Sequence, residues 1–224
     1  MNDKDFEKLV FGMTHQIRNP CAIILANASL ILQNPDLKAE TRRSLESIIN
    51  GAKYLESRLD EFVEFSKPIR LILKEVSLNK LLNQTVSLLA EKCQLKRTKI
   101  SCNLNGELVL PKADYDQILL AFLNITLNSI ESIQEWGTIS LEARPEGKNV
   151  LISVKDSGCG IHPRDLPEVF SPFYSTKEGG VGIGLAVSKK IIESHEGKIE
   201  LQSQLGKGTT VIVFLPGMGK ESRG

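Results

Sequence analysis

Three groups of residues have types and spacings suited to phosphoryl chemistry, and the first contains a histidine. His15 lies four residues before Asn19, and Pro20 follows directly. In a helix this spacing places the two side chains on one face. The proline cannot donate a hydrogen bond to the carbonyl of Gln16 and should kink the helix there. A neutral imidazole at such a bend is a workable nucleophile near neutral pH, although a lone exposed histidine is more often an ordinary surface residue.

The second group is a polar line through an apolar segment that is predicted to form a long helix over 113–135. Asn124, Asn128 and Glu131 follow at i, i+4 and i+7, and Gln117 and Glu135 extend the line. An ordinary solvent-facing stripe has the same pattern. The functional interpretation is a pocket whose amide and carboxylate oxygens hold a metal and phosphates, because Mg²⁺ prefers oxygen ligands and takes few of them from the protein.

The third group consists of three glycine-rich motifs that follow the polar line. They are Asp156-Ser157-Gly158-Cys159-Gly160, Gly180-Val181-Gly182-Ile183-Gly184-Leu185 and Gly206-Lys207-Gly208-Thr209. Glycines let the backbone come close to a ligand, and a helix N-terminus favours phosphate. The second motif matches a dinucleotide fingerprint only loosely, because no strand directly precedes it. Each motif alone is weak evidence, but the three in this order, behind the asparagine-bearing segment, are strong evidence for a phosphate-binding site.

Two long helices are predicted to carry the histidine. Their apolar residues recur at heptad spacing, which makes a narrow stripe suited to packing on partner helices. The stripes consist of Phe6, Val10, Met13, Ile17, Ile24, Ala28 and Ile31, then Leu45, Ile48, Ala52, Leu55, Leu59 and Phe62. His15 lies off the first stripe. Because two helices cannot enclose a core, we expect a homodimeric four-helix bundle, and a coiled-coil spacer that only dimerises fits the stripes equally well.

The second half of the chain, from about Val76, alternates between helices and strands. Helices are predicted over 78–95, 113–135 and 184–195, and strands over 99–104, 108–110, 138–143, 149–155, 198–203 and 209–214. Several antiparallel strands interspersed with helices predict an α/β sandwich. The Gly- and Pro-rich stretch 158–184 is too long for a structureless loop in a compact domain, so it is interpreted as a lid over a ligand.

These patterns divide the chain near Pro68, which ends the second helix because the residue before a proline disfavours the helical conformation. We expect a dimerisation and histidine-bearing hairpin over 1–67 and a linker or hinge over 68–75. The α/β sandwich, which the resemblance described below identifies as an ATP-binding catalytic domain, is expected over 76–217, followed by a flexible tail over 218–224.

Composition argues against several other function classes. The 224-residue chain has a formal net charge of +1, so its overall field does not indicate nucleic acid or an anionic membrane. No apolar run reaches the roughly 18 residues that cross a bilayer, so no membrane segment is expected in this chain. The four cysteines form no C-x-x-C pair, which disfavours zinc and disulfides and fits a reducing cytoplasm.

Together these motifs resemble those of the sensor histidine kinases of two-component systems, over nearly the whole chain. Residues 14–20 are similar to the phosphoacceptor box, 123–132 to the asparagine box, 156–160 to the adenine-binding glycine box and 170–177 to the lid signature. The later glycine motifs are similar to the family's remaining boxes. The resemblance implies a dimeric four-helix bundle followed by a two-layer α/β sandwich of the Bergerat type, which binds ATP and Mg²⁺.

The resemblance also implies roles for single positions. His15 would accept the γ-phosphate of ATP and pass it to an aspartate in the receiver domain of a response regulator, whose dephosphorylation Asn19 would assist. Asn128 would ligate Mg²⁺ with Asn124 nearby, and Asp156 would bind the adenine amino group. The other expected nucleotide-binding positions are Glu131 of the polar line and nine residues of the lid and the glycine motifs. These nine are Gly158, Gly160, Thr176, Lys177, Gly180, Gly182, Gly184, Leu185 and Thr209.

Some positions depart from the family pattern. Gln16 stands where the family usually has an acid that polarises the imidazole, so we expect slow autophosphorylation with the phosphatase direction favoured. Val181 replaces the usual threonine of the second glycine box, with a modest expected effect. Asn124 stands where gyrase-type ATPases have a water-activating glutamate, which favours transfer over hydrolysis. Lys177, by contrast, follows the family pattern and, on the lid, would offset phosphate charge.

Other functions remain open beside the kinase. Gln16 supports a nucleotide-binding dimeric scaffold, or a regulator phosphatase with weak or no autokinase activity. An ATP-hydrolysing member of the wider superfamily is disfavoured by the His15 box and by Asn124. His162 and His195 are assigned structural roles, and a cation at His195 would suit the end of its helix.

The source of the signal is also open. With 14 residues before His15, the input is expected from a separate sensory protein or from a sensory domain that this chain lacks. The signal, the cognate regulator and the choice between transfer within a protomer and across the dimer are not readable from the residues.

Overall fold

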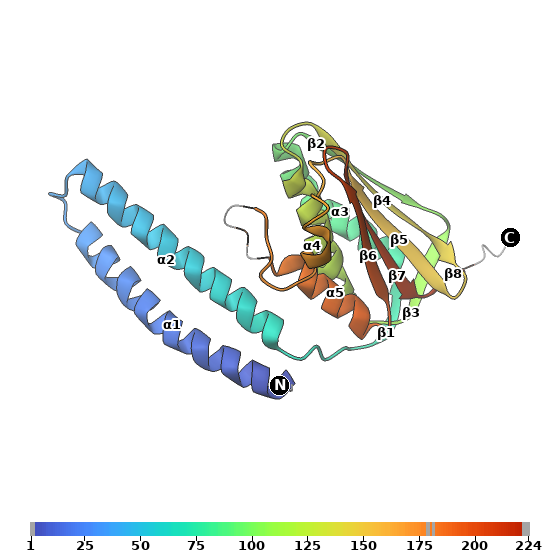
Figure 1. Ribbon diagram of the computed structural model, residues 1–224, viewed down its shortest axis with the longest axis horizontal. Helices are drawn as coiled ribbons and strands as arrows, with labels where there is room; N and C mark the ends of the chain where they lie inside the picture. Colours follow the sequence, from blue (N-terminus) through green and yellow to red (C-terminus); the bar gives the residue numbers. More distant parts are fainter. Residues whose placement is uncertain (1–2, 178–179, 181, 221–224) are drawn as a thin grey trace. The chain divides into compact units, whose positions relative to one another are not determined.

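The computed structural model describes the backbone of residues 3–177, 180 and 182–220, so Val181 lies outside the described residues. The chain forms two compact units, Met1–Pro68 and Ile69–Gly224. Figure 1 shows a helical hairpin in the first unit and a layered α/β arrangement in the second. In the described part of the chain, no helix is both long and apolar enough for a bilayer span.

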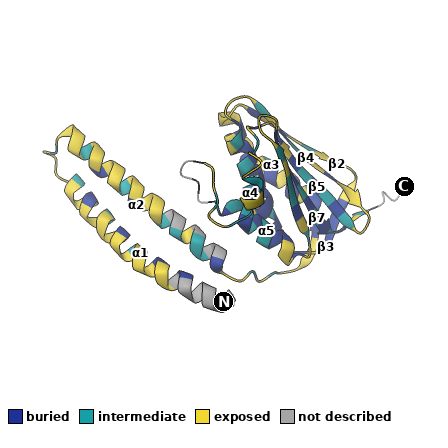
Figure 2. Ribbon diagram, viewed as in Figure 1, coloured by how far each residue is buried: buried dark blue, intermediate teal, exposed yellow. Residues whose placement is uncertain are grey.

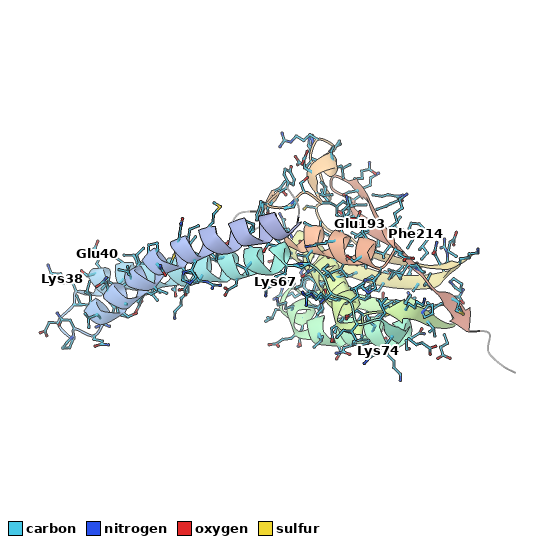
Figure 3. All side chains as sticks on the ribbon, turned by 90° about the horizontal axis from the view of Figure 1, so that it is seen from below. Lys38, Glu40, Lys67, Lys74, Glu193 and Phe214 are labelled. Atoms are coloured by element: carbon cyan, nitrogen blue, oxygen red, sulfur yellow. The ribbon has the colours of Figure 1, made fainter. Side chains whose placement is uncertain are left out.

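The first unit is a hairpin of α1 (Asp3–Leu32) and α2 (Ala39–Ser66), and α1 continues through Pro20. The turn between them lies beside Lys38 and Glu40 (Figure 3). In this turn the backbone N–H of Asp36 donates to the side-chain oxygen of Asn34 at 3.0 Å. The guanidinium of Arg42 donates to the carbonyl oxygens of Leu32 and Asn34 at 3.3 and 3.2 Å. The bond to Leu32 satisfies one of the carbonyls that the end of α1 leaves unpaired, and the others hold the turn that follows.

The apolar stripes of the hairpin are divided between two faces, which the sequence did not separate. Val10, Cys21 and Ala28 of α1 are buried in the hairpin, together with Leu45 and Ala52 of α2. Much of the hairpin is exposed (Figure 2). The exposed stripe residues are Met13, Ile17, Ile24, Ile31, Ile48 and Leu55. The side chain of Phe6 lies outside the description. Heptad spacing alone does not say which of two neighbouring lines faces the other helix, because the rotation of each helix decides it.

The second unit contains two sheets. The five-stranded sheet has the order β2-β4-β5-β7-β6, and the three-stranded sheet has the order β1-β3-β8. The strands are β1 (Lys74–Ser77), β2 (Thr98–Leu104), β3 (Glu107–Ala113), β4 (Gly137–Glu146), β5 (Asn149–Asp156), β6 (Lys198–Gln204), β7 (Gly208–Pro216) and β8 (Met218–Lys220). β2 pairs with β4 in parallel, so the expectation of antiparallel strands is wrong for this pair. The connection from β2 to β4 passes through the helix α4, as parallel neighbours require.

The helices of this unit are α3 (Leu78–Leu95), α4 (Tyr115–Ser132) and α5 (Gly184–Ser194), with a short 3₁₀ turn at Leu166–Glu168. They lie on one face of the five-stranded sheet (Figure 1). Leu141, Ile152 and Val213 are fully buried beneath them, and burial of each such side chain contributes about 1.5–3 kcal/mol. The predicted sandwich after a helical hairpin is therefore confirmed.

α4 ends earlier than predicted. Ile133, its C-cap, has extended backbone angles and is buried in the core. Glu135 therefore lies beyond the helix and does not extend the polar line. Local periodicity missed this end because burial of Ile133 turns the chain away from the helical path.

The segments expected to be linker and tail partly belong to the second unit. Ile69 packs against the core, and the N–H of Ile72 donates to Oδ2 of Asp114 at 2.7 Å. Lys74–Ser77 and Met218–Lys220 both pair with β3 in the antiparallel direction. The flexible tail expected over 218–224 thus differs at 218–220, because the free edge of β3 offers backbone partners that no local pattern reveals. Residues 221–224 lie outside the described residues.

Candidate nucleotide and phosphoacceptor sites

The helix α4 holds the polar line against the start of α5. Its first turn is capped by Asp114, whose Oδ1 accepts from the N–H of Gln117 at 3.2 Å. Asn124 and Asn128 are half-buried, while Glu131 is exposed. A Cβ added at Gly184 would lie 3.8 Å from Cβ of Asn124 and 3.9 Å from Nδ2 of Asn128. Both asparagines therefore face the N-terminus of α5.

The N-terminus of α5 is open to an anion. Its N-cap residue is the buried Ile183, whose apolar side chain makes no capping hydrogen bond to the first N–H groups of this helix. Such groups carry partial positive charge and are a ready site for phosphate. Asn124 and Asn128 line the same place, and Gly184 and Leu185 form the first positions of the helix there.

A cation already lies against the polar line. Nζ of Lys177 donates to Oδ1 of Asn128 at 3.0 Å and to Oε2 of Glu131 at 2.6 Å. Amide and carboxylate oxygens are ligands that Mg²⁺ accepts. In the described part of the chain, no group of three or more His, Cys, Asp and Glu residues could hold a metal ion. A metal at Asn128 would therefore depend on few protein ligands and on the phosphates, which suits Mg²⁺.

Asp156, at the end of β5, forms the opposite end of the site. Its side chain is buried, and Oδ1 lies within hydrogen-bonding distance of three donors: the N–H of Gly158 at 2.9 Å, the N–H of Thr209 at 3.1 Å and the hydroxyl of Ser132 at 3.2 Å. Oδ2 has no hydrogen-bond partner among the residues that the structure describes. A carboxylate held in this way offers one oxygen to a single donor, such as an amino group of a purine base.

Ser132 had no assigned role in the sequence, although it lies in the asparagine box. Its hydroxyl lies 3.2 Å from Asp156, and its carbonyl accepts from the N–H of Cys159 at 3.0 Å. It therefore joins the last turn of α4 to the first glycine motif. The sequence did show a hydroxyl at this end of the helix, but its partner Asp156 lies 24 residues further along the chain.

The glycines of the first and third motifs pack these motifs together. Gly160 has φ of +69°, and an added Cβ would lie 2.1 Å from the carbonyl oxygen of Gln204. A Cβ at Gly158 would lie 1.9 Å from Oγ of Ser132. The N–H of Gly206 donates to the carbonyl of Cys159 at 2.7 Å. A side chain at either glycine would therefore collide with the neighbouring motif or with Ser132.

The lid signature is anchored around Gly182. The N–H of Phe173 donates to the carbonyl of Gly182 at 3.0 Å. Gly182 has φ of +70°, and a Cβ there would lie 2.2 Å from the carbonyl oxygen of Tyr174, so only glycine fits. The hydroxyl of Tyr174 donates to Oδ1 of Asp165 at 2.7 Å, and this hydrogen bond is the main cause that raises the pKa of Tyr174. Thr176 is exposed.

The second part of the lid signature lies close to the glycine that follows it. The N–H of Gly180 donates to the carbonyl of Lys177 at 3.0 Å.

Thr209, from the third motif, is buried, and its hydroxyl lies 2.9 Å from that of Ser203. The structure thus brings together Asp156, Gly158, Gly160 and Thr209 at one end and Asn124, Asn128, Glu131, Lys177 and Gly184 at the other.

His15 is exposed on α1, in the other unit. Thr14 beside it is buried, and its hydroxyl donates to the carbonyl of Val10 at 2.7 Å. His15, Gln16 and Asn19 all lie on exposed positions of the helix. Arg18 forms an ion pair with Asp60 of α2. The histidine is therefore accessible to a phosphate donor, as the sequence predicted.

The other two histidines differ in their surroundings. His195 is buried, and its Nε2 accepts from the N–H of Asp114 at 2.9 Å. Nδ1 lies 2.8 Å from the carbonyl oxygen of Ile191, so the proton is on Nδ1 and the imidazole is neutral. The expectation of a cation at this helix end is wrong, because the hydrogen bond from Asp114 needs a free ring nitrogen. His162 is exposed, and its Nδ1 accepts from the N–H of Arg164 at 3.2 Å.

Comparison with protein families follows the two units. Residues 7–69 match the family His Kinase A (phospho-acceptor) domain. Residues 113–218 match the family Histidine kinase-, DNA gyrase B-, and HSP90-like ATPase. The sensor histidine kinase ZraS of Salmonella typhimurium is 34% identical over 214 residues, which are 95% of this chain and 46% of that protein. The chain thus spans just under half the length of this relative.

Two solved structures share the fold. Histidine kinase ThkA in complex with the response regulator protein TrrA has a TM-score of 0.69 and 28% identity, over 93% of this chain and 61% of that chain. Full-length ShkA in complex with AMPPNP has a TM-score of 0.76 over 96% of this chain and 47% of that chain, with 24% identity, and shows the likeness of fold alone. Both domain families occur in the order that the resemblance implied, and these relatives, which align with more than nine tenths of the chain, are histidine kinases. The chain therefore belongs to the sensor histidine kinases of two-component systems and comprises a phosphoacceptor hairpin and an ATP-binding domain.

Proposed function

We propose that this chain binds ATP with Mg²⁺ along α4 and transfers the γ-phosphate to His15, from which it passes to an aspartate of a response regulator. The observation that carries the proposal is the polarity of the site. Asp156 leaves one carboxylate oxygen open at one end, while the uncapped start of α5 and Asn128 lie at the other. This order fits a base at the first end and phosphates at the second.

The chain's own residues would act mainly by positioning and charge. Asp156 would hold the base, the N–H groups at the start of α5 would bind phosphate oxygens, and Asn128 would hold Mg²⁺. When bound, Mg²⁺ supplies positive charge that offsets the phosphates. A neutral nitrogen of His15 would attack the γ-phosphorus in line with the leaving oxygen of ADP, which the aligned binding groups favour. Asn124 has an amide and cannot act as a base toward water.

A homodimer is part of the proposal. The exposed apolar face of the hairpin, formed by Met13, Ile17, Ile24, Ile31, Ile48 and Leu55, is what a four-helix bundle would bury. A bundle of this kind would present His15 and Asn19 on its outer surface, since both are exposed and lie off that face.

Partners of the bundle are proposed on a different ground. The complex of ThkA with a response regulator supports a receiver domain as the partner of this hairpin. The input would come from a sensory domain or protein upstream.

The four cysteines are free thiols, which supports a reducing compartment such as the cytoplasm.

A second function is favoured by one residue. Gln16 is exposed beside His15 and brings no charge that would stabilise an imidazolium. A dimer that binds nucleotide and mainly dephosphorylates its regulator would need no acid at this position. The two functions differ in whether His15 becomes phosphorylated.

The test is incubation with Mg²⁺ and γ-labelled ATP, followed by measurement of acid-labile, base-stable label. We expect label on the parent protein, none on His15→Ala and an unchanged amount on His162→Ala, which removes another exposed histidine. Absence of label on a parent protein that binds ATP would reject the autokinase and favour the phosphatase or scaffold.

A further inference from the structure

The ion pair between Lys177 and Glu131 includes a third residue, Asn128 of the polar line. Nζ of Lys177 lies 2.6 Å from Glu131 and 3.0 Å from Oδ1 of Asn128, the oxygen expected to ligate Mg²⁺. The side chains of Lys177 and Glu131 are 39% and 54% exposed, so solvent reaches both. Exposed pairs of this kind contribute little to stability. The contact is therefore of interest for what it places at Asn128.

We propose that Glu131 is a metal-positioning residue and that the ammonium of Lys177 occupies the place of Mg²⁺ until the nucleotide arrives. The proposal rests on the nucleotide-binding function proposed above. Asn128 and Glu131 are three residues apart on α4, so their oxygens face the same space. Both accept hydrogen bonds from one cation, which shows that the two oxygens converge on a single positive charge.

The ammonium and the metal compete for this place. Mg²⁺ requires an oxygen at about 2.0–2.1 Å in near-octahedral geometry. An ammonium 3.0 Å from the same oxygen of Asn128 would lie no more than about 5 Å from a metal ligated by that oxygen. Like charges at such a separation repel strongly. Binding of Mg²⁺ at Asn128 therefore favours the release of Lys177, and Lys177 at Asn128 opposes the binding of Mg²⁺.

The exchange leaves each group with a partner. Lys177, once released, can pair with the phosphates that arrive together with the metal. Glu131 loses its ammonium and keeps an exposed carboxylate beside the metal, where a water held by Mg²⁺ can donate to it. The lid is anchored upstream through Phe173 and Tyr174, so only the segment that carries Lys177 needs to move.

A second lysine–glutamate pair provides the matched control. Nζ of Lys198 lies 2.5 Å from Oε1 of Glu200 on β6, with side chains 70% and 41% exposed. It has the same chemistry and a similar separation, but it lies outside the nucleotide site. Substitutions there test for a general effect of charge.

The first experiment measures ADP binding by calorimetry as a function of the Mg²⁺ concentration. ADP is used because it lacks the γ-phosphate that would be transferred to His15. In Glu131→Gln the factor by which Mg²⁺ tightens ADP binding should fall by about tenfold, the effect expected for loss of a residue that orients a metal site. In Lys177→Met the Mg²⁺ concentration for half of this effect should fall by about threefold, since a competing cation is absent. Glu200→Gln and Lys198→Met should match the parent.

The outcomes separate this inference from the proposed function. A parent protein that binds no ADP would contradict the proposed function itself. A parent that binds ADP, with an unchanged Mg²⁺ effect in Glu131→Gln or an unchanged Mg²⁺ requirement in Lys177→Met, would overturn this inference alone.

The second experiment reports on the contact without any metal or nucleotide. Cleavage after Lys177 by a lysine-specific protease should be faster in Glu131→Gln than in the parent, because the ammonium has lost its strongest partner. Glu200→Gln should leave the rate of this cleavage unchanged. Equal rates in parent and Glu131→Gln would show that Lys177 is not held, and would overturn the proposal.

Discussion

The amide nitrogen of Thr209 lies 3.1 Å from Oδ1 of Asp156, which is 53 residues earlier in the chain. The same oxygen also accepts from Gly158, so the third glycine motif and the first are held by one carboxylate oxygen. Its neighbour Oδ2 has no hydrogen-bond partner in the described part of the chain. The glycine motifs therefore orient an acceptor, in addition to any contact that they make with a ligand.

Asp156→Asn should weaken ADP binding by about 10- to 100-fold, the equivalent of one hydrogen bond to a charged group. The amide can keep its oxygen on the three donors, but its NH₂ group then replaces Oδ2 and faces the amino group of the base. Calorimetric titration measures the loss, and Asp116→Asn, at an exposed position in the first turn of α4, is the control. Equal affinities for parent and Asp156→Asn would exclude this carboxylate from base recognition.

Leu55→Glu should convert a dimer into monomers. Leu55 is 50% exposed in the isolated hairpin and belongs to the apolar face that we expect a second copy to cover, so a carboxylate there would be buried unpaired in the bundle. Sedimentation should give the mass of two chains for the parent and of one for the variant, with similar helical circular dichroism. Lys53→Glu, at an exposed position nearby, should remain dimeric. A monomeric parent would disprove the bundle.

Gln16→Glu should raise the rate of His15 phosphorylation by about tenfold or more, because a carboxylate beside the imidazole stabilises its developing positive charge. Single-turnover labelling at saturating ATP measures the rate. Gln202→Glu, at an exposed position of β6, adds the same charge elsewhere and should have no effect. An unchanged rate would show that the missing acid does not limit this protein.

Alkylation should distinguish the four cysteines by pH. Burial raises the pKa of Cys93 and of Cys102, so at a given pH fewer of these thiols are in the reactive thiolate form. Cys21 is buried, whereas Cys159 is exposed in the first glycine motif. Near pH 8 iodoacetamide should therefore modify Cys159 first, and labelling of Cys93 and Cys102 should increase only at higher pH.

Peptide mass spectrometry checks this order, with Cys159→Ser as the control. ADP should slow the modification of Cys159, since this residue lies between two glycines of the nucleotide site. Equal labelling of Cys93 and Cys159 at pH 8 would contradict the predicted order. Modification of Cys159 at the same rate with saturating ADP would show that the nucleotide does not cover it.

His195→Phe should lower the free energy of unfolding of the ATP-binding unit by about 1–3 kcal/mol, because it leaves the buried N–H of Asp114 without an acceptor. Denaturant unfolding followed by the fluorescence of Trp136 reports on this unit alone, since the chain has one tryptophan. His162→Phe, at an exposed position, should have little effect. A variant as stable as the parent would show that the Asp114–His195 bond is dispensable.

Local patterns were enough to predict much of this protein. The helix over 78–95 coincides with α3, since apolar periodicity and the capping Ser77 are local properties. The glycine motifs and the asparagine line predicted the nucleotide site because their spacing carries the chemistry directly. The phosphoacceptor box likewise predicted an accessible histidine, since its neighbours on α1 set which side it faces.

Tertiary structure decided the relations between distant residues. The placement of β8 beside β3, the parallel pairing of β2 with β4 and the choice of heptad line that faces α2 all depend on partners far along the chain. So does the contact of Lys177 with Asn128, which are 49 residues apart. Periodicity and motifs describe what a segment can offer, whereas pairing depends on which surfaces meet, and for this reason the cation at the polar line and the hydroxyl of Ser132 at Asp156 appeared only in the folded chain.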